Sequence, residues 1–163
     1  MTLSRITEGA VDVVLVWHMH QPDYRDTATG DFRLPWVYLH AMKDYADMAA
    51  HLEAHPRMRA VVNFVPILLD QLEDYTDQFA TGHLRDPLLR LLARPDNEPF
   101  TEAEREAVLE QCFHANHQQM IEPFPAYRRL QEIARQVEGY GRESVAYLSD
   151  WYLRDLLTWY HLS

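Results

Sequence analysis

Two histidines separated by one residue, His18 and His20, are the side chains in this sequence best placed to do chemistry. They follow the apolar, β-branched run at residues 11–17 and precede Gln21 and Pro22. Alternate residues of a strand face the same side, so we expect both imidazoles to point together beyond the strand end. In parallel α/β folds, active sites form at this carboxyl edge.

Two kinds of chemistry fit the histidine pair. Neutral imidazoles are good ligands for zinc and similar ions, and such a site needs further His, Asp or Glu ligands, which no obvious motif here supplies. Alternatively, the imidazoles hydrogen-bond to sugar hydroxyl groups. A third interpretation treats them only as polar residues at a strand edge. The histidines alone do not decide between these alternatives.

Two further segments are expected near this edge. Trp36 lies close to the start of a predicted helix and shares one helical face with His40, Asp44, Asp47 and His51. The simplest interpretation is a solvated polar face, while Trp36 is a candidate platform on which a sugar ring could stack. Asn63 ends a second apolar segment, where we expect it to cap the following helix rather than contact a ligand.

Carboxylates are abundant, but none occupies an identifiable strand end. Asp70, Glu73, Asp74 and Asp77 cluster early on one predicted helix, where we expect them to face solvent. Glycoside hydrolysis normally requires two carboxylates flanking one bond. The sequence shows no such pair.

The elements that must position these residues begin with a strand–helix–strand unit. Residues 11–17 and 60–65 read as strands, and a helix beginning at Pro35 and ending near His55 connects them. This order predicts parallel pairing through a right-handed crossover. We expect residues 1–66 to form this βαβ unit and residues 67–163 to be mostly helical. Helices are predicted at 67–79, 87–93, 102–117, 127–137 and 145–162.

Local signals support several helix ends. Asp86 precedes a proline, Thr101 and Glu104 form a capping-box pattern, and Gly139 is a plausible terminator. Two parallel strands make a poor sheet, and the last predicted helix has no stop signal. We therefore expect the chain to be part of a longer protein whose further strands lie downstream.

Composition limits the function classes. The 163 residues are 47% hydrophobic and carry a formal net charge of −10, which disfavours nucleic-acid binding. No apolar run approaches the roughly 20 residues of a membrane helix, and no signal peptide is recognisable, so we expect no membrane partner and a cytoplasmic location. Cys112 is the single cysteine and is expected to be a small buried hydrophobe.

With these residues identified, the chain resembles the N-terminal part of glycoside hydrolase family 57, the α-amylase and glucanotransferase-like enzymes. Four segments carry the resemblance, at residues 17–22, 34–45, 63–72 and 153–162. They occur in the expected order over nearly the whole chain. One departure is that Asp23 precedes Tyr24, whereas many members have a tyrosine directly after the His-Gln-Pro segment.

The resemblance implies an α/β fold, the beginning of an incomplete TIM-like (β/α)7 barrel with a helical insertion. It implies that His18, His20 and Gln21 bind substrate in a sugar-binding cleft, with Pro22 shaping the turn. Trp36 as a subsite aromatic is an extension of this assignment. The implied substrate is an α-glucan oligosaccharide or polysaccharide.

The resemblance also implies a retaining mechanism that needs no metal or other cofactor. Its glutamate nucleophile and aspartate acid/base belong to regions downstream of anything matched here. We therefore expect no catalytic residue in this chain, and no activity from it alone. Two alternatives remain open: a metal-dependent hydrolase with an HxH site on its first strand, and a non-catalytic helical interaction module.

Overall fold

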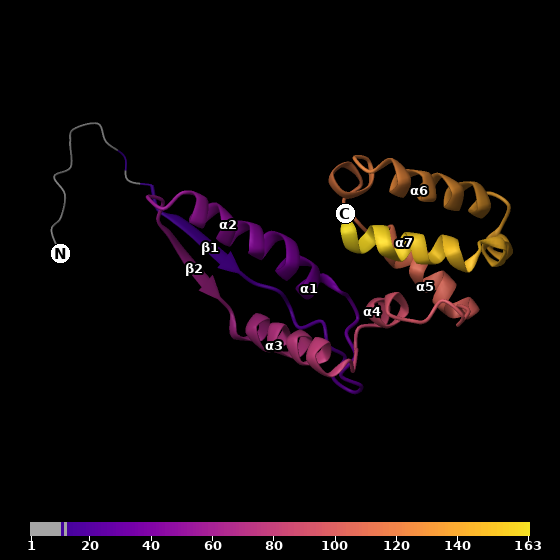
Figure 1. The fold of residues 1–163 in the computed structure, drawn as a ribbon, viewed down its shortest axis with the longest axis horizontal. Helices are drawn as coiled ribbons and strands as arrows, with labels where there is room; N and C mark the ends of the chain where they lie inside the picture. The colour runs from indigo at the N-terminus through magenta and orange to yellow at the C-terminus, as the bar shows by residue number, and fades with distance from the viewer. Residues whose placement is uncertain (1–10, 12) are drawn as a thin grey trace. The chain divides into compact units, whose positions relative to one another are not determined.

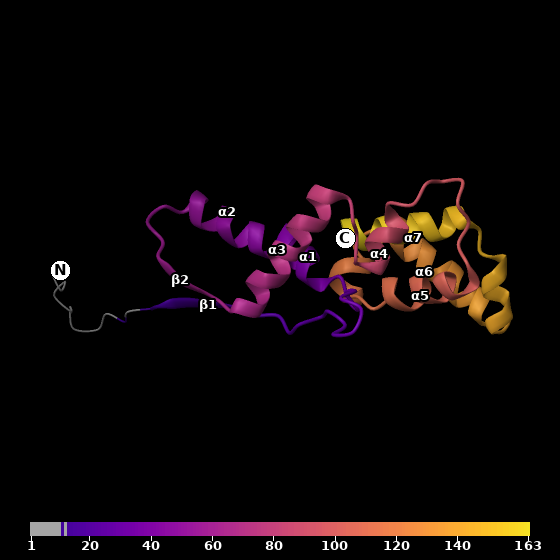
Figure 2. The same ribbon diagram turned by 90° about the horizontal axis from the view of Figure 1, so that it is seen from below.

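The computed structural model describes residue 11 and residues 13–163, which divide into two compact units (Figures 1 and 2). The sheet unit contains the described residues up to Tyr24 together with Trp36–His83. The helical unit contains Arg25–Pro35 and Leu84–Ser163. The segment 25–35, which follows the histidine pair, therefore belongs to the helical unit although both of its neighbours in the chain belong to the sheet unit.

Two strands, β1 (Leu15–Met19) and β2 (Ala60–Phe64), form a parallel sheet, as the strand–helix–strand order predicts. The register aligns Leu15 with Ala60 and His18 with Asn63. β1 begins later than the predicted strand and extends through His18 to Met19. The structure is thus an α/β arrangement, with these two strands in the described part of the chain.

The two faces of this sheet differ in exposure. Val16 and Val61 lie on the face that also carries His18 and Asn63, and their exposed fractions are 60% and 53%. On the opposite face, Val62 and Phe64 are 40% and 42% exposed, and Met19 is only 6% exposed. The helix that connects the strands runs beside the sheet in both views (Figures 1 and 2). The face that carries His18 and Asn63 is therefore the less covered of the two at its apolar positions.

The connecting helix is interrupted by a wider turn. It comprises α1 (Trp36–His40), a π-helical segment (Ala41–Tyr45) and α2 (Ala46–Ala54). Tyr38 and Met42 are four residues apart, a spacing that predicts one apolar stripe along the helix, yet Tyr38 is buried and Met42 is 68% exposed. A π-turn accommodates one extra residue, so the predicted apolar stripe loses its register at this point.

The helix after β2, α3 (Pro66–Thr81), begins at a proline and ends at Gly82, whose φ of 71° is left-handed. Its buried face includes Leu68, Gln71, Tyr75 and Gln78. Asp74 also lies on this face, so the prediction that it faces solvent was wrong. Its carboxylate accepts a hydrogen bond of 2.7 Å from Gln78, which offsets part of the cost of burial.

The helical unit contains α4 (Pro87–Leu92), α5 (Glu102–Cys112), α6 (Pro125–Glu138) and α7 (Asp150–Leu162). A π-helical segment (His117–Ile121) and a 3₁₀ segment (Arg142–Tyr147) precede α6 and α7 respectively. Two predicted helices were too long, because 102–117 ends at Cys112 and 145–162 begins only at Asp150. Ser149 caps α7 by accepting a hydrogen bond from the Tyr152 N–H, which explains the later start.

Other helix ends follow the local signals. The Asp86 side chain accepts hydrogen bonds from the Leu88 and Leu89 amides, and Thr101 and Glu104 form a reciprocal capping box. Gly139 does follow α6, but with helical rather than left-handed dihedral angles. The caps at Asp86 and Thr101 show that short-range patterns determined where α4 and α5 begin.

The core of the helical unit is apolar and well buried. α5 and α6 both pack on α7. The Cys112 thiol is buried as predicted, and burial raises its pKa. Core residues with an exposed fraction of 1% or less are Phe32, Leu88, Val108, Cys112, Ile121, Tyr127, Leu153, Leu156 and Leu157. No helix in the described part of the chain is long and apolar enough to span a membrane.

Candidate functional site

The carboxyl edge of the sheet brings the two histidines together. The rings of His18 and His20 are stacked, with centroids 5.8 Å apart and an interplanar angle of 12°. Both side chains are exposed. The alternation of strand residues therefore places the imidazoles side by side, facing the open side of the sheet.

Asn63 pairs with His18 across the two strands. The two residues are register partners, and the Asn63 Oδ1 lies 2.7 Å from the His18 Nδ1. An amide oxygen only accepts hydrogen bonds, so this contact places a proton on Nδ1. In the neutral ring, Nε2 then accepts a hydrogen bond from a ligand; in the cation it donates one. The contact thus controls which nitrogen of His18 meets a ligand.

The prediction that Asn63 caps the next helix was wrong. The N-cap position of α3 is Val65, which has no side-chain cap, and Pro66 occupies the first turn, where no N–H is required. Asn63 lies too early in the chain for this role because β2 continues through Phe64. Its pairing with His18 depends on strand register, which the sequence alone did not reveal.

Gln21 and Trp36 are joined through Tyr24. The Tyr24 hydroxyl donates a 2.8 Å hydrogen bond to the Gln21 Oε1, and its ring meets Trp36 edge-on at 5.7 Å. Tyr24 is partly buried, and desolvation raises its pKa, so its hydroxyl stays protonated as a donor. Three residues from the two sides of the 25–35 segment therefore form one cluster.

The remaining polar residues of the connecting helix behave as a solvated face. His40 pairs with Asp44 one turn later, and Asp47 and His51 are exposed. Trp36 differs from them because it is partly buried and contacts Tyr24. The structure thus separates Trp36 from the other residues that share its helical spacing.

Gln71 is a residue of this region whose role the sequence analysis missed. It lies on α3, is fully buried, and hydrogen-bonds to Pro22 and Tyr24 in the loop after β1. The available signal was its spacing, because Gln71 falls within the apolar stripe of α3 that includes Leu68 and Tyr75. A polar residue at a core position indicates a specific hydrogen-bonding task.

Among residue 11 and residues 13–163, no group of three or more His, Cys, Asp or Glu side chains is arranged to hold a metal ion. Acidic side chains are also missing from both strands, whose sequences are LVWHM and AVVNF. The site that the described residues build is therefore made of imidazole, amide, hydroxyl and aromatic groups. These groups can hydrogen-bond to hydroxyls and stack on apolar ring faces.

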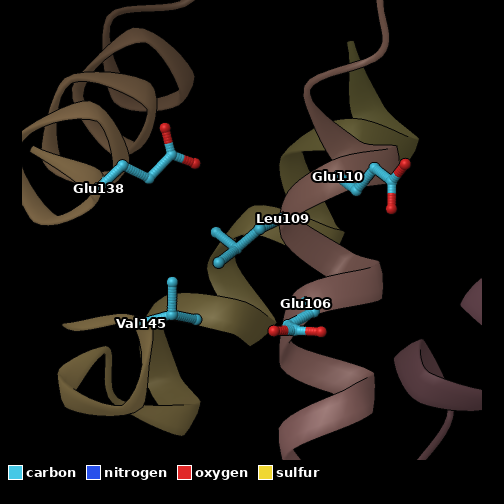
Figure 3. Close-up of a pocket in the computed structure, with 5 residues that line it drawn as sticks. All are labelled: Glu106, Leu109, Glu110, Glu138 and Val145. Carbon is cyan, nitrogen blue, oxygen red and sulfur yellow. The ribbon is translucent and has the colours of Figure 1, made fainter. Parts of the chain in front are cut away.

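The helical unit contains a cavity of about 490 Å³ whose lining differs from the strand-edge site because it is acidic (Figure 3). Leu109 and Val145 form its apolar part, and three glutamates lie around it: Glu106, Glu110 and Glu138. Glu106 and Glu110 come from α5, whereas Glu138 comes from the end of α6. None of the predicted site residues lines this cavity.

Comparison with known proteins shows the family of this chain. No curated protein and no solved structure matches the chain. The family model described as Glycosyl hydrolase family 57 matches residues 14–156, which include both strands, the histidine pair and nearly all of the helical unit. The chain belongs to glycosyl hydrolase family 57.

Proposed function

We propose that this chain contributes the first part of the substrate cleft of a retaining glycoside hydrolase or glucanotransferase that acts on α-glucans. His18, His20 and Gln21 hydrogen-bond to sugar hydroxyls, and Trp36 stacks on a sugar ring at the rim. Family membership supports a glycosidase-type enzyme acting on a glucan carbohydrate.

The observation that carries this proposal is the arrangement at the carboxyl edge of the sheet. His18 and His20 stack side by side, and Asn63 on the neighbouring strand binds the Nδ1 of His18. In the described part of the chain, no other group hydrogen-bonds to the His20 ring nitrogens or to the Nε2 of His18. Three ring nitrogens thus remain available to a hydroxyl-rich ligand.

The uncovered face of the sheet supports the proposal that the two strands belong to a larger barrel. Val16 and Val61 are exposed on the same face as the polar residues His18 and Asn63, and each precedes them by one strand repeat. In a barrel built from parallel strands, inward-facing apolar side chains fill the interior, while polar residues at the carboxyl ends form the site. The face therefore has the pattern of a barrel interior, and we assign it to an incomplete TIM-like (β/α)7 barrel.

The two catalytic carboxylates belong to other strands of that barrel. Neither β1 nor β2 carries an aspartate or glutamate. Retaining hydrolysis needs a nucleophile and an acid/base whose carboxyl groups lie about 5–5.5 Å apart across the scissile bond. The chain supplies binding groups without these, so it is inactive by itself.

Titration of the chain with maltoheptaose tests the proposal. Binding followed by NMR should shift the ring signals of His18 and His20, and His20→Ala should weaken the affinity about fivefold or more, as expected for losing a ligand hydrogen bond. His51→Ala removes an exposed histidine of α2 and is the matched control. The chain should release no reducing sugar from maltoheptaose.

Three results would contradict the proposal. Saturating maltoheptaose could leave both histidine signals unmoved, or His20→Ala and His51→Ala could bind equally well. Steady release of reducing sugar by the purified chain would show that catalytic carboxylates are present, and would overturn the assignment of catalysis to other strands.

A further inference from the structure

The side chain of Gln71 hydrogen-bonds to the backbone of the loop that follows β1. Its Nε2 donates to the carbonyl oxygens of Pro22 at 2.9 Å and Ile67 at 3.1 Å. Its Oε1 accepts from the Tyr24 N–H at 3.0 Å. The side chain is 0% exposed, so these bonds form away from water.

The bonding pattern requires an amide. Pro22 has no N–H and offers only a carbonyl acceptor, whereas Tyr24 offers a backbone donor. A carboxylate cannot donate to Pro22, an ammonium cannot accept from Tyr24, and an apolar side chain can do neither. From its place on α3, Gln71 satisfies both backbone groups at once, the Pro22 carbonyl and the Tyr24 N–H.

The same loop carries Gln21, whose side-chain oxygen accepts the Tyr24 hydroxyl. This bond directs the Gln21 carbonyl toward Tyr24 and leaves its Nε2 without a hydrogen bond within the described part of the chain. The orientation of the Gln21 amide therefore depends on Tyr24, and the backbone of Tyr24 depends on Gln71.

We propose that Gln71 is a positioning residue that, through Pro22 and Tyr24, fixes Gln21 so that its Nε2 is presented as a hydrogen-bond donor to an α-glucan hydroxyl oxygen. The use of this donor rests on the proposed function. The positioning itself is a property of the folded chain with or without ligand.

Two variants test the contacts that link Gln71 to Gln21 through Tyr24, each at a different point. Gln71→Met keeps the length of the side chain but removes all three of its hydrogen bonds. Tyr24→Phe keeps the ring against Trp36 and removes only the hydroxyl that reaches Gln21. In both, the Gln21 side-chain NH₂ signals in NMR should shift and broaden, and maltoheptaose affinity should fall about fivefold.

Gln78→Met is the matched control. Gln78 is an equally buried glutamine of the same helix, 1% exposed, whose Nε2 donates to Asp74 of α3. Gln78→Met should lower the free energy of unfolding about as much as Gln71→Met does. The NMR signals of Gln21 and the affinity for maltoheptaose should stay unchanged. This contrast separates positioning of the loop from general destabilisation of α3.

The proposal is overturned if Gln71→Met moves the Gln21 signals no more than Gln78→Met does. Should Gln71→Met fail to fold, Tyr24→Phe decides, and unchanged Gln21 signals in that variant are equally fatal. If the unmodified chain does not bind maltoheptaose, the proposed function fails, whereas the Gln21 signals of the ligand-free variants still confirm or refute the positioning.

Discussion

The helices of the helical unit and the strands of the sheet unit differ in how completely their apolar side chains are covered. In the helical unit, Leu153, Leu156 and Leu157 of α7 are each 0% exposed and lie among helices that pack on one another. In the sheet unit, Val16 and Val61 remain more than half exposed, beside polar residues at the strand ends. Apolar content alone does not make a core, because each face also needs a neighbouring element to cover it.

The difference extends to polar contacts. In the helical unit, Arg105 and Arg154 bind backbone carbonyls and carboxylates that tie loops to helices. In the sheet unit, Asn63 hydrogen-bonds to His18 near the end of β1, and the hydrogen bonds of Tyr24 and Gln71 hold the segment that follows the strand. The first set stabilises a fold, while the second orients side chains that still have free hydrogen-bonding capacity.

The largest expected effect is in the helical core. Leu156→Ala should lower the free energy of unfolding by about 2–5 kcal/mol, because it removes buried methyl groups and leaves a cavity. Leu162→Ala, on the same helix but 67% exposed, is the control and should change it by less than about 0.5 kcal/mol. Urea unfolding followed by circular dichroism measures both. Equal losses of unfolding free energy in Leu156→Ala and Leu162→Ala would show that α7 is not packed as described.

The next largest effect on the free energy of unfolding is expected at the ion pair between Arg94 and Glu104 in the helical unit, and it should depend on pH. The Arg94 guanidinium holds the pKa of Glu104 at about 2, below its usual 4.5. A lowered folded-state pKa contributes stability that is complete above pH 4.5 and is lost as the pH falls toward 2. Both side chains are partly solvated, so we expect Glu104→Gln to cost about 1–2 kcal/mol at pH 7.

The test compares this variant with the unmodified chain across pH. The difference in unfolding free energy should shrink between pH 4.5 and pH 2, because the protonated carboxyl no longer pairs with Arg94. Glu132→Gln provides the control, since its pair with Arg129 is well exposed. A difference that stays constant over this range would refute the pairing.

A smaller effect is expected in the sheet unit at Asn63. Asn63→Ala removes the acceptor on the His18 Nδ1 and should cost about 0.5–1 kcal/mol. The neutral His18 ring should then populate both tautomers, which ¹⁵N chemical shifts detect directly. His83, an exposed residue beyond α3, serves as the internal reference. An unchanged tautomer ratio would mean that Asn63 does not control His18.

The smallest effect is expected on the uncovered sheet face. Val61→Thr should change the free energy of unfolding by less than about 0.5 kcal/mol, because the side chain is already 53% exposed. The same substitution at a covered position such as Val108 should cost well over 1 kcal/mol, since it buries a hydroxyl. A large cost at Val61 would show that this face is covered in solution, and would end the contrast between the two units.

Much of the local structure could be predicted from short-range pattern. The parallel strands, the start of α3 at Pro66, the caps at Asp86 and Thr101, and the burial of Cys112 follow from residue type and spacing. The errors occurred where residue type alone did not decide exposure. Asp74 lies on the buried face of α3, where Gln78 one turn later donates a hydrogen bond to it, and Met42 lies in the π-helical segment that interrupts the connecting helix.

The candidate site shows the same division. The sequence by itself predicted that the side chains of His18 and His20 lie together at the end of the first strand, because alternation along an extended chain is a local property. Only the tertiary structure decided that Asn63 binds His18 and that Gln71 holds Pro22 and Tyr24, at sequence separations of 45 to 49 residues. Such contacts depend on strand register and on where α3 packs, and neither is encoded in the spacing of neighbouring residues.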